Sequence, residues 1–207
     1  MVKRFDMKQA LYLEDIDVCF VLSMAMGMVI TMNYADIKRI DVANGPGVRV
    51  SLFVSGCTHH CKECFNPETW DFSYGNIFDE NAENEIIKYL EPDYIKGLTL
   101  LGGDPMEKVN QEALIPLLEK VKKTYPDKSI WCYTGYDFEE DIKKNMLKNW
   151  EVTKKFMSYI DVLVDGEFKI DLKDLNLVFR GSSNQRIIMV KESLESGKIV
   201  LWEKTEG

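Results

Sequence analysis

Short apolar runs alternate along this chain with longer amphipathic segments. Val48–Val54 is dominated by β-branched and other large apolar residues, a composition typical of a buried strand. The next segment, Glu80–Leu90, has apolar residues grouped at helical spacing and is followed by Pro92. A strand followed by a helix is therefore predicted as the repeating unit.

The same alternation continues toward the end of the chain. The segments predicted in turn as strand and helix are residues 97–101, 111–123, 129–133, 137–150 and 162–164. Residues 186–190 and 198–202 are predicted as two last strands, joined around Ser196 and Gly197. Strands that alternate with helices form parallel sheets with helical crossovers, so an α/β fold is predicted.

Length and charge narrow the class of protein. The 207 residues are enough for one sizeable core, and no internal repeat or linker divides them. Hydrophobic residues make up 45% and charged residues 29%, as in ordinary globular proteins. The formal net charge of -8 disfavours a nucleic-acid partner, because binding to phosphates requires a basic face.

The first 31 residues differ from the rest. Residues 18–32 form an uncharged, methionine-rich run, but a membrane-spanning helix needs about 20 apolar residues. Acidic residues at positions 14, 15 and 17 stand where a secretory signal is basic, so neither a membrane span nor a signal is expected. Residues 1–31 are interpreted as an N-terminal extension, either a helix packed on the domain or, as we favour, sequence upstream of a natural start at Met32. Residues 32–207 are then a single domain.

Three of the five cysteines lie close together, as Cys57, Cys61 and Cys64. This C-x3-C-x2-C loop directly follows the first predicted strand and presents three thiols to one small volume, which can hold an iron–sulfur cluster. A [4Fe-4S] cluster takes four ligands, so three cysteines leave one iron open to a substrate or cofactor. The crowding and odd number of cysteines disfavour a disulfide framework and favour the reducing cytoplasm.

A structural zinc site is the alternative for the same cysteines, with His59 or His60 as the fourth ligand. The spacing alone leaves both metal centres open. Iron analysis and an electronic spectrum of anaerobically purified protein distinguish them, because zinc without iron would exclude the cluster. Cys132, within a predicted strand, is interpreted as a small buried apolar residue.

A second loop suited to ligand binding follows the next predicted strand. Gly102 and Gly103 lack Cβ atoms, which lets the backbone approach a ligand closely. Asp104 can accept a hydrogen bond from an ammonium group, and Pro105 stiffens the exit. Loops after the carboxyl ends of parallel strands form the sites of α/β folds, so this turn and the cysteine loop are expected to share one site.

Together the two loops resemble the radical S-adenosylmethionine (SAM) superfamily, whose acidic turn usually carries Glu where this chain has Asp104. The resemblance implies that Cys57, Cys61 and Cys64 hold a [4Fe-4S] cluster and that the amino and carboxylate groups of SAM chelate its open iron. It also implies a SAM site formed by Glu63, Cys64, Phe65, Gly102, Gly103, Asp104 and Thr134. Asp165 and Gly166 are expected to face the same cavity.

Further motifs resemble the family of activating enzymes of anaerobic ribonucleoside-triphosphate reductase. They occupy residues 44–49, 52–57, 64–70, 133–136, 161–166 and 179–186, and the resemblance runs from about Met32 to Val190. It implies an incomplete, open (β/α) barrel of the radical SAM type, because about 160 family-like residues are too few for the roughly 250 of a complete barrel.

The resemblance also implies an oxidoreductase that generates a glycyl radical. A one-electron donor such as reduced flavodoxin reduces the cluster, SAM is cleaved to methionine and a 5'-deoxyadenosyl radical, and that radical takes a hydrogen atom from a glycine of the reductase large subunit. No acid–base pair is required, because the cofactors carry the chemistry. The polar residues 180–186 are either a solvated loop or a contact for the partner's glycine-bearing loop. The alternatives are an activating enzyme for another glycyl-radical enzyme and a zinc-binding adaptor.

Overall fold

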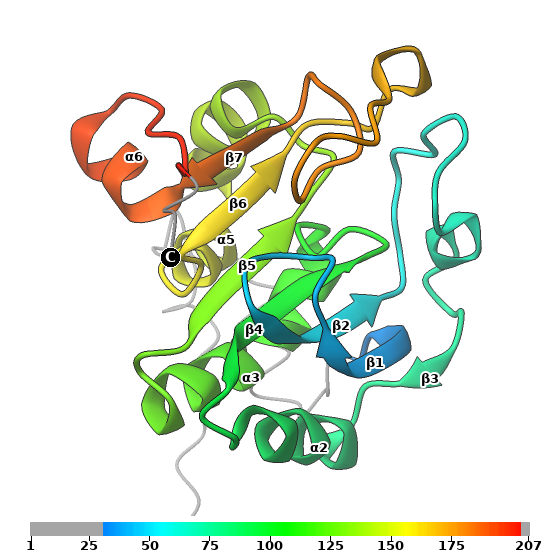
Figure 1. The fold of residues 1–207 in the computed structure, drawn as a ribbon, viewed down its shortest axis with the longest axis vertical. Helices are drawn as coiled ribbons and strands as arrows, with labels where there is room; N and C mark the ends of the chain where they lie inside the picture. The colour runs from blue at the N-terminus through cyan, green and yellow to red at the C-terminus, as the bar shows by residue number, and fades with distance from the viewer. Residues whose placement is uncertain (1–30, 204–207) are drawn as a thin grey trace, which may run out of the picture. The chain divides into compact units, whose positions relative to one another are not determined.

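A computed structural model describes residues 31–203 of the chain, so the predicted N-terminal extension lies outside the described residues except for Thr31. One seven-stranded sheet runs through this part, in the order β3-β1-β2-β4-β5-β6-β7 (Figure 1). The strands are β1 (Asn33–Asp41), β2 (Val48–Val54), β3 (Asn76–Ile77), β4 (Ile95–Gly102), β5 (Ser129–Tyr133), β6 (Val162–Asp165) and β7 (Arg186–Met189). The α-helices are α2 (Glu80–Leu90), α3 (Lys108–Thr124), α4 (Leu147–Asn149), α5 (Glu151–Met157) and α6 (Val190–Ser196).

The sheet is mixed and open. Strands β2, β4, β5 and β6 are parallel neighbours, as predicted, and the α/β class is confirmed. The strands β1, β3 and β7 run antiparallel to their neighbours, whereas the sequence pattern predicts a parallel sheet. The edge strands β3 and β7 do not pair with each other, so the sheet is not closed.

The predicted last strand, residues 198–202, is wrong. After β7 the chain turns into helix α6, which ends at Gly197 in the left-handed conformation with φ of 73°. Beyond it, Leu201 forms only a single bridge to Ile188. The predicted helix at residues 137–150 is confirmed as helical, but most of it is a π-helix, η3 (Phe138–Met146).

Helices cover one face of the sheet, and the main core lies there. Alternate residues of β2 point to this face, so that Val50, Leu52 and Val54 pack in one cluster with Leu114 and Leu117 of α3. Burying one such side chain contributes roughly 1.5–3 kcal/mol. No helix within residues 31–203 is long and apolar enough to cross a membrane.

The opposite face of β2 carries a buried arginine. Arg49 has no exposed surface, and its guanidinium donates to Oγ1 of Thr99 at 2.7 Å, to the carbonyl of Leu98 at 2.8 Å and to the carbonyl of Ser129 at 2.9 Å. Burial lowers the pKa of Arg49 to about 10, so the group is still charged at neutral pH. The hydroxyl of Thr99 in turn donates to the carbonyl of Asn44 at 2.8 Å, which ties the β1–β2 loop to the sheet.

We expect Arg49→Met to lower the free energy of unfolding by about 3 kcal/mol, because a buried hydroxyl, a buried carbonyl and a partly buried carbonyl lose their donor. Urea unfolding followed by circular dichroism measures the change. The control is Arg39→Met, at an exposed position, for which a loss below about 0.5 kcal/mol is expected. Equal losses in the two variants would contradict the structural role of Arg49.

Candidate metal centre

A cavity of about 450 Å³ lies where the four parallel strands end, within the size range of small-molecule sites. The loops after β2, β4, β5 and β6 all contribute to its wall. Figure 1 shows the loops after β2 (cyan) and β6 (orange) at the same edge of the sheet. The two loops that the sequence predicts to share a site do line one cavity.

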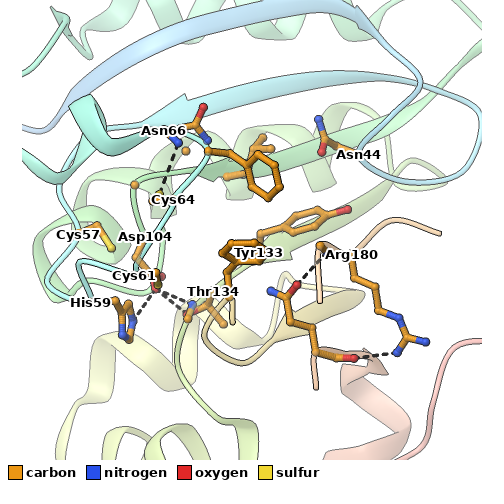
Figure 2. A pocket seen from close by; sticks show the side chains of 18 of the residues that line it. Asn44, Cys57, His59, Cys61, Cys64, Asn66, Asp104, Tyr133, Thr134 and Arg180 are labelled. Carbon is orange, nitrogen blue, oxygen red and sulfur yellow. Dashed lines mark hydrogen bonds and ion pairs between the residues drawn. The ribbon is translucent and has the colours of Figure 1, made fainter. Parts of the chain in front are cut away.

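All three predicted metal ligands line this cavity (Figure 2). Cys57 follows β2, and its backbone N–H donates to the carbonyl of Trp70 at 3.2 Å. The Sγ atom of Cys64 accepts from the backbone N–H of Asn66 at 3.4 Å. Burial raises the pKa of the Cys57 thiol to about 12 and that of Cys61 to about 11, the latter with a further contribution from the charge of Glu167. Without a metal these thiols therefore keep their protons at neutral pH, which is unsuitable for a catalytic nucleophile.

A structural zinc ion, the alternative for the same cysteines, needs a fourth ligand close to all three thiols. A tetrahedral zinc ion holds its ligand atoms within about 4 Å of one another, since Zn–S distances are about 2.3 Å. Within residues 31–203, no three His, Cys, Asp or Glu side chains are grouped so as to hold one ion. The two candidate fourth ligands have other contacts: His59 Nε2 lies 3.0 Å from Asp104 Oδ2, and His60 stacks on Trp70 with ring centroids 4.8 Å apart.

The diglycine turn packs directly against the exit of β2. The N–H of Gly103 donates to the carbonyl of Val54 at 2.7 Å, and the N–H of Asp104 donates to that of Gly56 at 2.8 Å. A Cβ atom on Gly103 would lie 2.5 Å from the Gly56 oxygen and 2.9 Å from the Thr69 oxygen. The sequence predicts that the missing Cβ atom makes room for a ligand, whereas in the structure that space is filled by backbone. Both glycines nevertheless line the cavity.

Asp104 joins three loops through one carboxylate. Its side chain is 1% exposed, and Oδ2 accepts from Thr134 Oγ1 and the Gly135 N–H, both at 2.9 Å. The Nε2 atom of His59 is the third neighbour of Oδ2, and the N–H of Met106 donates to Oδ1 at 2.8 Å. Burial alone would lower the pKa of His59, but the hydrogen bond and the charge of Asp104 outweigh it, so the pKa is raised.

The remaining predicted SAM contacts differ in position. Thr134 and Phe65 line the cavity, although the Phe65 residue is 62% exposed and packs against Phe168. Glu63 is exposed and is not among the residues that line the cavity, and its contact with SAM stays a prediction.

The structure separates the two residues at the end of β6, Asp165 and Gly166, that are predicted to face the cavity. Gly166 lines the cavity, whereas the carboxylate of Asp165 accepts from the N–H of Phe138 at 2.9 Å and pairs with Arg186. Asp165 therefore holds the π-helix and β7 against β6. The prediction that it faces the cavity is wrong.

One wall of the cavity is built around Phe179, and the sequence patterns do not predict it. This residue has a left-handed backbone with φ of 55°, a conformation that costs of order 1–3 kcal/mol for a bulky side chain. The hydroxyl of Tyr133 donates to its carbonyl at 2.9 Å, and Trp131 and Trp202 pack against its ring. The motif at residues 179–186 is the sequence signal for this wall, but it does not identify Tyr133 as the residue that holds it.

Comparison with known proteins agrees with a cluster site. A family model described as a 4Fe-4S single cluster domain matches residues 43–188, which is most of the chain. The chain thus carries an iron–sulfur cluster domain, in accord with the cysteine spacing.

Curated relatives define the family more narrowly. The chain is 47% identical to a protein of Haemophilus influenzae over 158 residues, covering 75% of this chain and 97% of the relative. It is 40% identical to a protein of Enterobacteria phage T4 over 176 residues, covering 85% and 97%, and 41% identical to one of Escherichia coli K12 over 156 residues, covering 74% and 96%. All three are named anaerobic ribonucleoside-triphosphate reductase-activating protein. The chain belongs to this family, as the sequence motifs predict.

Proposed function

We propose that this protein activates an anaerobic ribonucleoside-triphosphate reductase by generating a glycyl radical on its large subunit. The observation that carries the proposal is that three thiols and a diglycine turn line the same cavity at the carboxyl ends of the parallel strands. The names of the relatives support the reductase as the target. We assign the chain to the radical SAM oxidoreductases, with a cytoplasmic location and a one-electron donor such as reduced flavodoxin.

Cys57, Cys61 and Cys64 would hold a [4Fe-4S] cluster, which when bound supplies the electron for reductive cleavage of SAM. The residues of the chain have the task of binding and orienting SAM. The backbone of Gly102 and Gly103 forms one wall of its site, and Asp104 fixes that wall by its bonds to Thr134 and His59. Phe65 supplies an aromatic surface at the rim.

The open sheet suits a macromolecular substrate. We interpret the parallel strands β2 to β6, with helices on one face and the cavity toward the other, as the incomplete (β/α) barrel of radical SAM enzymes. An unclosed wall lets a glycine-bearing loop of another protein reach the SAM carbon, while the buried strand ends limit the access of water to it.

The test is an anaerobic reaction of the cluster-loaded protein with SAM, a reductant and the cognate reductase. The expected result is a glycyl doublet in the electron paramagnetic resonance spectrum together with 5'-deoxyadenosine and methionine. Cluster-loaded protein that cleaves SAM but yields no doublet would overturn the reductase as the target. Absence of SAM cleavage would overturn the radical SAM assignment.

Arg180 is the residue we expect to act on the partner. It lines the cavity, where its guanidinium donates to the carbonyl of Gln185 at 2.7 Å, and Figure 2 shows it across the hollow from the cysteine loop. Arg180→Ala is expected to spare SAM cleavage by dithionite-reduced protein but to lower the yield of glycyl radical about tenfold, the effect of about 1.4 kcal/mol of lost contact. The side-chain amide of Asn184 donates to the carbonyl of Glu167 at 2.9 Å. Asn184→Ala is likewise expected to spare SAM cleavage and to lower the yield of glycyl radical.

The two activities are measured on one sample, as 5'-deoxyadenosine and as spin per reductase. Arg39→Ala, at an exposed position outside the cavity lining, is the control and should leave both unchanged. Equal loss of both activities in Arg180→Ala would show that the residue serves the SAM site instead.

A further inference from the structure

The backbone of the cysteine loop, residues 57–64, has two residues in an unfavourable conformation. His60 and Glu63 lie between the cluster cysteines and have left-handed conformations, with φ of 53° and 58°. Each such residue costs of order 1–3 kcal/mol and persists only where its surroundings hold it. The contacts that hold this loop in place therefore decide how the thiols are arranged.

The first contact joins the loop to the residue that precedes helix α3. The backbone N–H of Thr58 donates to Oε1 of Glu107 at 2.9 Å, and its hydroxyl donates to the same oxygen at 2.6 Å. The hydroxyl of Tyr136 donates to this oxygen at 3.3 Å. One carboxylate thus binds three donors, two of them from the residue next to Cys57.

The second contact lies one residue further along the loop. The ring of His59 meets Asp104 at 3.0 Å and packs edge-on against Tyr136, with ring centroids 4.3 Å apart. Asp104 is itself fixed by Thr134 and by the N–H of Gly135. Both anchored residues, Thr58 and His59, lie between the first two cysteines.

We propose that Glu107 and Asp104 are positioning residues that form a latch, defined as the pairs Thr58–Glu107 and His59–Asp104, which arranges the cysteine loop before a cluster binds. The carboxylates come from the segment between β4 and α3, which Thr134 and the carbonyls of Val54 and Gly56 also hold, so the latch connects the loop to a well-bonded part of the fold. A loop ordered in advance loses less conformational entropy when the cluster is inserted. The proposal rests on the cluster-binding part of the proposed function and is independent of the reductase.

Hydrogen–deuterium exchange of the metal-free protein tests the latch directly. In Glu107→Ala we expect residues 57–64 to exchange at least about tenfold faster than in the unsubstituted protein, because local opening of the loop becomes easier. Glu107→Gln keeps an oxygen acceptor for Thr58 and should restore most of the protection. His59→Phe keeps the ring against Tyr136 but removes the bond to Asp104, and it should add to the effect of Glu107→Ala.

Cluster assembly provides the second measurement. Iron and sulfide incorporated during anaerobic reconstitution should accumulate at least about fivefold more slowly in Glu107→Ala, with the thermal midpoint of the metal-free protein unchanged. Glu119→Ala, which removes an exposed carboxylate of helix α3, is the matched control and should match the unsubstituted protein in both measurements.

The outcomes separate the latch from the proposed function. Unchanged exchange and unchanged assembly in Glu107→Ala would overturn the latch while the proposed function stands. Failure of the unsubstituted protein to take up any cluster would overturn the proposed function, and the exchange comparison, which needs no metal, would still decide whether the latch orders the loop.

Discussion

Replacing Cys61 with alanine is expected to abolish cluster retention and, with it, all glycyl radical formation. Cys61 is one of three thiols on the cavity wall, and the only other cysteine among residues 31–203, Cys132, is fully buried in the helix-covered core and cannot replace it. Two thiolates leave two irons without protein ligands, so the cluster is lost. Iron content, the visible absorption of the reconstituted protein and the glycyl doublet measure the result.

Cys132→Ala is the matched control for the loss of a thiol. It removes a small side chain from the core, which costs about 1 kcal/mol of unfolding free energy, and leaves the cavity wall intact. Full iron content and a full radical yield are expected in this variant. A Cys61→Ala protein that still forms the radical would show that the ligand assignment is wrong.

Gly103→Ala is expected to lower SAM cleavage about 10²-fold, the effect of misplacing a positioning element by roughly 1 Å. The new Cβ atom would lie within 3 Å of two backbone oxygens, those of Gly56 and Thr69, which belong to the exit of β2 and the turn that packs on it. Neither can move without moving the cysteine loop, so the diglycine turn must withdraw. The yield of 5'-deoxyadenosine per cluster measures the change and corrects for any loss of iron.

Gly197→Ala separates this effect from a general cost of replacing glycine. Gly197 has φ of 73°, so alanine is strained there, but nothing lies within 4 Å of the added Cβ atom. This variant should lose stability and keep its SAM cleavage per cluster. If Gly103→Ala cleaves SAM at the normal rate, the turn is not part of the SAM site.

The sequence predicts the central strands well because they are buried on both sides. Strands β2, β4, β5 and β6 are short and apolar, and each stands out from the polar residues around it. Strand β1 is not predicted from the pattern because charged residues interrupt its apolar positions and much of it is exposed. Residues 190–196 form a helix where the pattern gives only a turn, since a short segment with few apolar positions has little periodicity.

In the candidate site, too, local features can be predicted from the sequence and contacts between distant residues cannot. Cysteine spacing and the diglycine turn are local in the chain, and both are visible in the sequence. The contacts of His59 with Asp104 and of Tyr133 with Phe179 join residues about 45 positions apart, and they depend on which strands are neighbours. Such pairs follow from the strand order and not from any single motif.

The aromatic packing around Phe179 gives Trp202 a part in shaping the cavity wall. Trp202 lies beyond the stretch that matches the family model, yet its ring contacts both Trp131 and Phe179. A truncation or fusion that displaces this indole would release a backbone that its neighbours hold in an unfavourable conformation, and the cavity wall at Phe179 would relax. Trp202 is therefore a support for the pocket, even though the family model does not extend to it.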